Sequence, residues 1–527
     1  MYPLIPYPNQ IQFFEKNTYF SNFKIEIEPK FIRSIQQFEK DLNKKLLKNE
    51  NEKVFLFQFI INKKYKKEQY SLQINQEHCL IEAKSANGFF YACKTLSQLL
   101  FLHTPIQVKE LEIPCLEIND KPKYAFRSFM IDEVRHFFGK NEIKKIIDLM
   151  ADLKFNYFHW HLSDDQGFRI HFKEFEKLKT ISSKRNKTKI NGMDSPDFDE
   201  TPYEFCYEVN DIREIIEYAK ERFIEIIPEI DLPGHTTAIV AAYPELHCLH
   251  KHVEVATDFG VFKEILCPSK QETLDFTKKL LKALCSLFKE SKYIHIGGDE
   301  VNVTNWQLCP DCQRKLKELQ LDDFKLLQQN FANEIANYLQ SLGKKVISWH
   351  DGIHENTNKD VILQYWTWEM DKERIDIMNT GRTSIYSPCS QFYFNDPYAE
   401  LPLKTTYTRK ITLYGLTRTG QSAIYGVEGC IWSEWIDSNE LLEVLILPRL
   451  HALSEKAWTK NSQQNFKDFL IRLEAYHPIL DFKGFSYAST KLALAKGKQY
   501  RDKIAKAFRA NDKKVEFKLY QKQLKKK

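Results

Sequence analysis

The sequence predicts an α/β protein: a (β/α)8 TIM barrel preceded by a small α/β domain. Eight short apolar segments with the composition of buried strands alternate with longer amphipathic segments that have helical spacing. Alternating strands and helices indicate a parallel sheet with crossover connections. Each strand segment also ends in polar or aromatic residues, as barrel strands do on the face that carries an active site.

The first 120 residues are expected to form the small, non-catalytic α/β domain. VFLFQFII (Val54–Ile61) and CLIEAK (Cys79–Lys84) are typical of strands. NGFFYACKTLSQLLFL (Asn87–Leu102) has helical spacing and begins at an asparagine, a residue that favours helix starts. The turn-rich NDKPKY (Asn119–Tyr124) predicts the domain boundary.

The barrel is expected over residues 121–465. Its strand segments are RSFMIDEVRH, FNYFHWHLSDD, IEIIPEIDLPGH, YIHIGGDEV, KKVISWHDG, DVILQYWTW, SIYSPCSQFYFN and GVEGCIWSEW. Helical patterns between them include KNEIKKIIDLMADL, DIREIIEYAKERF, ETLDFTKKLLKALCSLF and DDFKLLQQNFANEIANYLQSLG. Connections after the sixth and seventh strands are short, so the helices there are the least defined. An open doubly wound sheet is the competing arrangement, but no glycine-rich phosphate turn supports it.

Residues 466–527 are expected to be helices that pack on the barrel, followed by a solvated basic tail, KLYQKQLKKK (Lys518–Lys527). The net charge of +6, from 77 basic against 71 acidic residues, is too balanced to indicate a nucleic-acid partner. No apolar stretch approaches the length of a membrane span. The start, MYPLIPYPNQ, shows no signal-peptide pattern, so the compartment is left open, as is the oligomeric state, a homodimer included.

The cysteines give little guidance in sequence. There are 11, an odd number, and they are scattered. Cys309 and Cys312 have the spacing of half a zinc site, but no second pair stands near them in the chain, so a loop disulfide or two free thiols is expected. His159 and His161 lie on one side of a strand, yet no further ligand is dictated. No metal and no cofactor are therefore expected.

The strand ends together have the composition of a sugar site. Sugar hydroxyls need charged acceptors and donors, and pyranose faces stack on indole rings. Any one of these residues alone is more simply a loop polar group or a core aromatic, but eight agreeing strand ends favour a common site. The residues are Asp132, Arg135, His159, His161, Asp164, Asp165, Asp231, His235, Asp299, Glu300, Trp349, Trp366, Tyr393, Trp432 and Glu434.

Asp299 and Glu300 are adjacent, which is unusual for a pair of catalytic carboxylates. Consecutive residues of a strand point to opposite faces. Ordinary glycosidases place two carboxylates about 5 to 10 Å apart across the scissile bond. One of the two is therefore expected to be the acid, and the other to contact the substrate elsewhere. A conventional two-carboxylate glycosidase, with Asp164 or Asp231 as the partner nucleophile, stays an alternative.

Five segments, HIGGDEV, MIDEVRHFFG, FHWHLSDDQGFR, PEIDLPGH and GCIWSEW, resemble the signature segments of glycoside hydrolase family 20, the β-N-acetylhexosaminidases. They occur in the family's order, and the resemblance spans roughly residues 1 to 460. It implies that the substrate's own 2-acetamido oxygen is the nucleophile. Glu300 would be the general acid and base, Asp299 would orient the acetamido group and stabilise the oxazolinium ion, and Tyr393 would hydrogen-bond the acetamido oxygen.

The resemblance also implies the substrate-binding residues. Arg135 is expected to hold the 3- and 4-hydroxyls, with Glu434 sharing the 4-hydroxyl. Asp164 and His235 are expected behind Glu300. Walls of the terminal-sugar pocket are expected from Trp349, Trp366 and Trp432. Two positions depart from the family pattern: Asn395 stands where many members carry Asp beside the 4- and 6-hydroxyls, and Asn305 where many animal members carry Cys.

The function implied is a retaining exo-β-N-acetylhexosaminidase acting on terminal GlcNAc or GalNAc of oligosaccharides or glycoconjugates. Alternatives are a relative that releases a disaccharide, such as a lacto-N-biosidase, and a catalytically silent sugar-binding protein. The presence of Asp299, Glu300 and Tyr393 disfavours the silent protein. Asn395 leaves the preference between GlcNAc and GalNAc open. Members of the family are commonly lysosomal, periplasmic or secreted.

Overall fold

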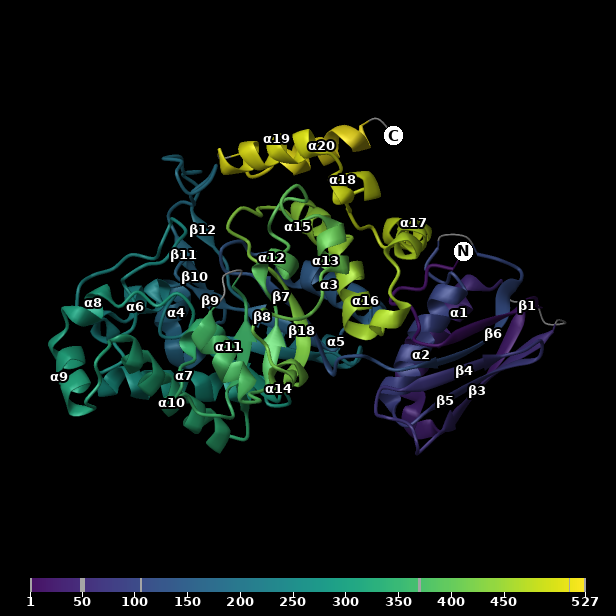
Figure 1. Ribbon diagram of the computed structural model, residues 1–527, viewed down its shortest axis with the longest axis horizontal. Helices are drawn as coiled ribbons and strands as arrows, with labels where there is room; N and C mark the ends of the chain where they lie inside the picture. The colour runs from purple at the N-terminus through teal and green to yellow at the C-terminus, as the bar shows by residue number, and fades with distance from the viewer. Residues whose placement is uncertain (1, 48–52, 105–106, 368–370, 511, 526–527) are drawn as a thin grey trace.

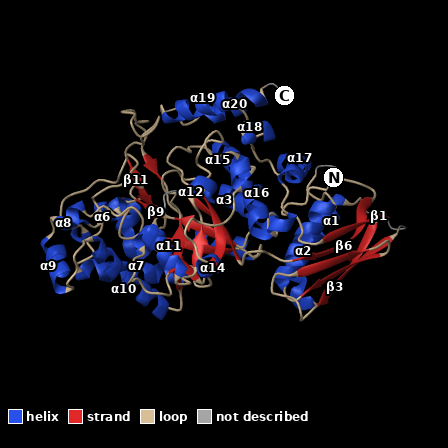
Figure 2. Ribbon diagram, in the orientation of Figure 1, coloured by secondary structure: helices blue, strands red, loops and turns tan. Residues whose placement is uncertain are grey.

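The computed structural model describes residues 2–47, 53–104, 107–367, 371–510 and 512–525 (Figure 1). Figure 2 shows the barrel strands near the centre and the open sheet of the first domain to their right, and the strands near the centre form a closed barrel. Among the described residues, no helix is both long and apolar enough to cross a membrane. The expected fold class, a (β/α)8 barrel with a small α/β domain before it, is confirmed.

The barrel closes through eight parallel strands in the order β13-β14-β15-β16-β17-β18-β7-β8. All eight expected segments supply a strand. Their bounds are β7 Phe126–Asp132, β8 Tyr157–His161, β13 Glu225–Glu229, β14 Tyr293–His295, β15 Lys345–Trp349, β16 Ile362–Tyr365, β17 Ser384–Tyr386 and β18 Ile424–Ile431. Trp368, the last residue of the sixth quoted segment, lies outside the described residues.

Amphipathic helices cover the outside of the barrel. The four longest expected patterns form α3 (Gly139–Asp152), α5 (Val209–Lys220), α7 (Gln271–Leu287) and α10 (Lys325–Ser341). In α3 the buried side chains include Ile143, Ile146, Ile147 and Met150, one apolar stripe at helical spacing. After the sixth strand the connection holds a single helix, α11 (Lys372–Asn379). The expectation of a short connection after the seventh strand is wrong: between β17 and β18, residues 387–423 hold three short helices, α12 Cys389–Phe392, α13 Leu403–Thr408 and α14 Arg418–Ser422.

Side chains inside the barrel are sorted by height because strand residues alternate between inside and outside. At the amino ends of the strands lies an apolar layer with Phe126, Tyr157 and Tyr293, in which Phe126 stacks on Tyr157 at 4.5 Å. Two residues further along β8 and β14 come His159 and His295, which belong to a buried ionic layer. The carboxyl ends of the strands come next. The barrel interior is therefore apolar at the amino ends of the strands and highly polar toward their carboxyl ends.

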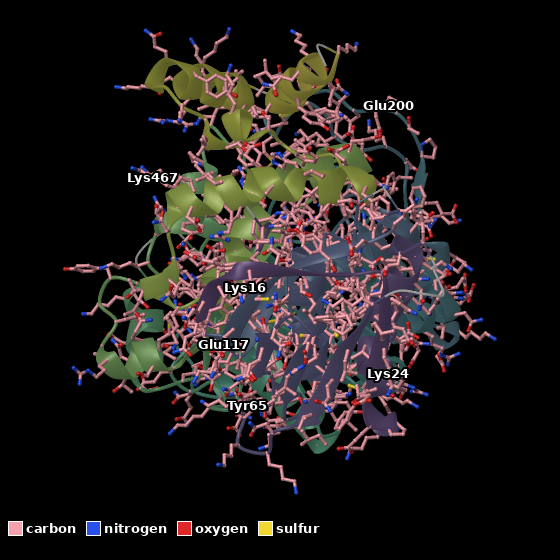
Figure 3. All side chains as sticks on the ribbon, turned by 90° about the vertical axis from the view of Figure 1, so that its right-hand side faces the viewer. Lys16, Lys24, Tyr65, Glu117, Glu200 and Lys467 are labelled. Atoms are coloured by element: carbon pink, nitrogen blue, oxygen red, sulfur yellow. The ribbon has the colours of Figure 1, made fainter. Side chains whose placement is uncertain are left out.

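The N-terminal domain is a six-stranded sheet in the order β1-β6-β4-β5-β3-β2, with α1 (Ile32–Lys45) and α2 (Ala86–Leu99) on the face toward the barrel (Figure 1). Figure 3 looks onto the other face, where Lys16, Lys24 and Glu117 point to solvent. The strands are β1 Ile11–Phe20, β2 Asn22–Glu26, β3 Val54–Ile61, β4 Tyr70–Ile74, β5 His78–Ala83 and β6 Leu111–Asp120.

The C-terminal region is more ordered than the sequence suggested. After α15 (Asn439–Ile446) and α16 (Arg449–Trp458), four helices follow: α17 Phe466–Phe482, α18 Thr490–Leu494, α19 Lys498–Arg509 and α20 Val515–Leu524. The expected tail is helical up to residue 524, as part of α20: Lys518 and Lys522 are exposed, but Tyr520 is buried. The helix is docked at its start, where the buried Glu516 carboxylate accepts hydrogen bonds from the backbone N–H groups of Tyr398 and Ala399. Residues 526 and 527 lie outside the described residues.

A buried carboxylate, Asp120, joins the N-terminal domain to the barrel. Its Oδ2 accepts hydrogen bonds from Tyr70 Oη (2.7 Å) and from Trp458 Nε1 (2.8 Å) on α16. Its Oδ1 accepts both the backbone and the side-chain N–H of Asn9. The ammonium of Lys154, also buried, lies 3.5 Å from Oδ2. We call these five residues the Asp120 cluster, and it places the small domain against the base of the barrel.

Asp120→Asn is expected to lower the free energy of unfolding by about 3 kcal/mol, because it leaves the Lys154 ammonium buried without a counter-charge. Urea denaturation followed by tryptophan fluorescence measures this. The matched control is Glu117→Gln on the same strand, whose side chain is exposed. Equal stability of the two variants would show that the cluster does not hold the domains together.

Candidate active site

The carboxyl ends of the barrel strands converge on one cluster of acids, histidines and aromatics. Contacts or close charge interactions link the candidate residues Arg135, Asp164, His235, Asp299, Glu300, Trp349, Trp366, Tyr393, Trp432 and Glu434 to one another. Asn395 follows Tyr393 closely in the chain, but among the described residues its side-chain oxygen has no hydrogen-bond partner. A cavity of about 600 Å³ lies at the opposite end of the barrel, where Tyr157 and Glu225 begin their strands.

The backbone turns sharply where Asp299 and Glu300 leave β14. Gly297 and Gly298 have φ values of +61° and +100°, and Glu300 itself has +51°. Side chains rarely adopt this left-handed region. A Cβ on Gly297 would lie 1.8 Å from Asp231 Oδ1, so only glycine fits beside that carboxylate. The turn ends the strand alternation and brings both acids to one site, each with its own surroundings.

Glu300 is set against a buried histidine. His235 Nε2 lies 3.5 Å from Glu300 Oε2, and His235 Nδ1 lies 2.9 Å from Asp165 Oδ2 and 3.2 Å from Asp164 Oδ1. Burial disfavours the imidazolium, but Asp164, Asp165 and Glu300 outweigh it and raise the pKa of His235 well above its usual range. The hydrogen bond from His235 in turn lowers the pKa of Glu300. Glu300 is the more accessible acid, with a side chain 42% exposed.

Asp299 has the opposite environment. It is buried, and its pKa is raised well above the usual range by that burial and by the nearby Asp231 carboxylate. Asp231 Oδ1 accepts the backbone N–H of Gly298 at 2.8 Å. Asp299 Oδ1 is buried with no hydrogen-bond partner among the described residues. A buried acceptor of this kind is costly unless a donor completes it. Asp299 is thus suited to receive an N–H from a bound molecule.

Arg135 is fixed by three acceptors. Its Nη2 lies 2.7 Å from Asp164 Oδ2, its Nη1 lies 3.3 Å from Asp132 Oδ2, and its Nε donates to Gln166 at 3.0 Å. The guanidinium also lies over the Trp432 ring at 5.1 Å. A planar cation that is locked in position presents its remaining N–H donors in a defined direction.

Four rings form an aromatic box beside these charges: Trp349, Trp366, Tyr393 and Trp432. Trp349 lies 5.9 Å from Trp432, Tyr393 lies 6.2 Å from Trp432, and Trp366 stacks on Tyr393 at 6.3 Å. Burial raises the pKa of Tyr393 well above its usual range, so its hydroxyl keeps its proton and can donate it in a hydrogen bond. Trp366 and Trp432 are partly exposed and offer flat apolar faces, Tyr393 offers one hydroxyl donor, and Trp349 is fully buried behind them.

Two site residues had been given no role from the sequence, Asp165 and Asp351. Asp165 makes the shorter of the two carboxylate contacts to His235 and is held by Thr237, whose backbone N–H and hydroxyl both bind Asp165 Oδ1. Asp351 joins two walls of the site: its Oδ2 accepts the backbone N–H of Glu300 at 2.8 Å, and its Oδ1 accepts Trp366 Nε1 at 3.0 Å. Asp165 already stood among the polar strand ends, whereas Asp351 had no sequence signal beyond following β15.

A buried ionic layer lies directly below the site. Glu229 accepts hydrogen bonds from Trp349 Nε1 (2.9 Å) and from His161 Nδ1 (2.5 Å), and lies 3.1 Å from His159 Nε2. His161 Nε2 lies 2.8 Å from Asp164 Oδ2. Burial opposes the charge of His161, but Glu229 and Asp164 raise its pKa to about 10. These histidines are therefore paired with carboxylates, and His159, Glu229 and His295 lie close enough together that one atom of each could hold a metal ion.

Glu434 and Asn395 lie half-buried at the rim. Burial raises the pKa of Glu434, while the Arg135 charge works against that rise. Asn395 Oδ1 is buried and has no hydrogen-bond partner within the described parts of the chain. Like Asp299, it offers an acceptor that a ligand donor would complete.

Cys309 and Cys312 have no second cysteine pair near them in the sequence, but they do have one in the folded protein. Cys248 and Cys267, distant in sequence, lie against them, and all four sulfurs are within 4.8 Å of one another. None of the four is in a disulfide. The spacing of the cysteines in the sequence could not predict this group of four, because the two pairs come from different barrel connections.

The comparisons with known proteins agree with this geometry. The family model described as "Glycosyl hydrolase family 20, catalytic domain" matches residues 124–461, and the model for "domain 2" of the same family matches residues 1–121. A β-hexosaminidase of Porphyromonas gingivalis is 32% identical over 442 residues, which span 80% of this chain and 55% of that protein. A β-hexosaminidase of Akkermansia muciniphila is 29% identical, over 79% of this chain and 84% of that protein.

Solved structures show the same architecture. The exo-β-N-acetylglucosaminidase of Vibrio harveyi, in complex with N-acetylglucosamine, superposes with a TM-score of 0.79 at 28% identity and covers 93% of this chain and 78% of that one. The N-acetyl-β-hexosaminidase of Streptomyces plicatus gives 0.76 at 26% identity, over 92% and 96% of the two chains. With both family models matched along its length and this carboxylate site at the barrel mouth, the chain belongs to glycosyl hydrolase family 20.

Proposed function

We propose that the protein is a retaining exo-β-N-acetylhexosaminidase that removes terminal GlcNAc or GalNAc by substrate-assisted catalysis. The single observation that carries the proposal is the divergence of two adjacent acids. Glu300 is accessible and paired with His235, whereas Asp299 is buried and keeps an unpartnered oxygen. Two carboxylates so different suit two different groups on one sugar.

In the first step, the carbonyl oxygen of the substrate's acetamido group attacks C1 as the bond from C1 to the leaving oxygen breaks. Glu300 gives its proton to the leaving oxygen. Asp299 accepts the acetamido N–H through Oδ1. The developing positive charge of the oxazolinium ion opposes the raised pKa of Asp299 and favours its carboxylate form, which in turn stabilises that ion. The Tyr393 hydroxyl donates to the attacking oxygen and fixes its direction.

In the second step, water attacks C1 and the bond from C1 to the acetamido oxygen breaks. Glu300, now a carboxylate, takes a proton from that water. Two displacements at C1 restore the β-configuration. His235 serves both steps, because its positive charge stabilises the carboxylate left after proton donation. A bound sugar covers Glu300 and removes water from it, which raises its pKa and favours the acid form before the first step.

The remaining site residues position the terminal sugar. Arg135 and Glu434 bind the 3- and 4-hydroxyls, and the aromatic box surrounds the ring and the acetamido methyl. Asn395 can donate and accept a hydrogen bond, so it tolerates either configuration of the 4-hydroxyl. We therefore propose that GlcNAc and GalNAc glycosides are both substrates. Disaccharide release, the second candidate, has no observation in its favour here.

Glu300→Gln is expected to lower kcat by about 10²- to 10⁴-fold on N-acetylhexosamine oligosaccharides, because it removes the proton donor. On aryl glycosides with acidic phenols the first step needs no proton, so a smaller loss is expected for that step. Steady-state and burst kinetics on both substrates measure this. The control, Glu355→Gln, changes an exposed acid on another loop. Equal losses in the rate of the first step, as the burst phase measures it on both substrates, would contradict the role of acid.

His235→Gln is expected to move the alkaline limb of kcat/KM to higher pH. The His235 hydrogen bond lowers the pKa of Glu300, so its removal raises that pKa, and the acid form then persists to higher pH. The maximum rate should fall as well, since Glu300 loses its support. His171→Gln, a surface histidine paired with Glu208, is the control. An alkaline limb that stays in place or moves to lower pH would show that His235 does not set this pKa.

Substrates without the 2-acetamido group are expected to react at least about 10³-fold more slowly, because the internal nucleophile is missing. Matched aryl β-GlcNAc and β-glucoside substrates measure the ratio. Asp299→Asn should lower kcat on the GlcNAc substrate more than it changes KM. Rapid β-glucoside hydrolysis would exclude substrate assistance, and an effect of Asp299→Asn on KM alone would exclude its assigned role.

A further inference from the structure

Four cysteine sulfurs meet in a compact group away from the reacting centre. Cys267 Sγ lies 3.6 Å from Cys312 Sγ and 3.8 Å from Cys309 Sγ, and Cys248 Sγ lies 3.9 Å from Cys312 Sγ. All four side chains are nearly inaccessible, with exposures from 0% to 4%. We call this group the thiol cluster.

The spacing of the thiol cluster is that of a tetrahedral metal site. Sulfurs bound at about 2.3 Å around one Zn²⁺ lie about 3.8 Å from each other, the edge of the tetrahedron. A disulfide would bring two sulfurs to about 2.05 Å and push that pair away from the others. The three measured separations of 3.6 to 3.9 Å fit the first arrangement.

The local structure also favours thiolates. Cys309 is the N-cap of α9 (Pro310–Glu318), and Cys312 lies in its first turn, where the helix dipole stabilises negative charge. Around the sulfurs, Ile265, Trp306 and Leu327 form an apolar shell that excludes water.

We propose that Cys248, Cys267, Cys309 and Cys312 bind one structural Zn²⁺ ion. Four thiolate ligands fill a tetrahedral zinc site and leave no position for water or substrate, as in structural rather than catalytic zinc sites. Soft sulfur donors in this geometry select zinc over calcium and magnesium. The ion would take no part in glycoside cleavage.

The place of the cluster explains what the ion would do. Cys248 and Cys267 lie at the two ends of the loop that follows α6 (Thr237–Ala242). This loop belongs to the connection that carries His235. Cys309 lies on the connection that carries Glu300, after α8 (Thr304–Gln307); α6, α8 and α9 gather at the left of Figure 1.

Hydrogen bonds already join these two loops: Trp306 Nε1 donates to Leu266 O at 3.0 Å, and Asn305 Nδ2 donates to Lys263 O at 2.7 Å. Zinc would lock the acid's loop to the loop of its supporting histidine.

The test is metal content and thiol count of the full-length wild-type protein, purified without added metal and dialysed against EDTA. Mass spectrometry of the metal is expected to find about one zinc per chain. Titration of the denatured protein in chelator should find all 11 cysteines as free thiols. Replacing zinc by Co²⁺ should give thiolate-to-cobalt absorption bands of a tetrahedral S₄ site.

Three variants connect the metal to these residues. Cys312→Ser should lose most of the zinc and lower Tm. Cys309→His, which keeps a zinc ligand, should retain the metal. Cys285→Ser, at a buried thiol of α7 outside the cluster, should retain it too. If Cys312→Ser does not fold, the zinc content and thiol count of the wild-type protein still test whether the thiol cluster binds zinc.

Several results would overturn the proposal. Eleven free thiols with no metal would mean four packed core cysteines. Fewer free thiols, restored by reductant, would mean disulfides. Iron in place of zinc would refute the assigned metal, and zinc that persists in Cys312→Ser would place it elsewhere.

Discussion

The site depends on a chain of buried charges that begins in the barrel interior. Glu229 holds His161, His161 holds Asp164, and Asp164 divides its two oxygens between Arg135 and His235. Each of these groups would cost several kcal/mol if it were buried alone. Because every charge is paired with the next, one rigid network sets the positions of the sugar-binding arginine and of the histidine behind the acid. The rigid barrel strands, rather than the loops alone, thus orient the chemistry.

A second constraint is backbone conformation. Asp299 and Glu300 meet at one site only because the chain leaves β14 through two glycines and a glutamate in the left-handed region. Such residues persist where the surroundings over-determine them. Here the surroundings are specific: Asp351 accepts the Glu300 N–H, and Asp231 fills the space that a Cβ on Gly297 would need. Strain is thus compensated by groups that belong to the site.

The barrel could be predicted from sequence because its signal is repeated: eight apolar segments, each ending in polar residues, and a period of two that puts His159 and His161 on the same side. The most informative anomaly, adjacent acids after two glycines, also lay in the sequence. What could not be predicted depends on distant partners. Asp351 acts through contacts between loops, and Cys248 meets Cys312 only when two barrel connections fold together. Helix α20 was not predicted because the basic end of the chain gave no sign that Glu516 and Tyr520 would be buried against other elements.

The Asp120 cluster has a consequence for the way this protein comes apart. Asp120 ends the last strand of the small domain, yet it holds Trp458 from the last helix of the barrel and Asn9 from the start of the chain. A cut that frees either domain leaves a lysine ammonium in an apolar surface without its counterion. We therefore expect the two domains to unfold together, because the contacts of Asp120 connect the first domain to the catalytic one.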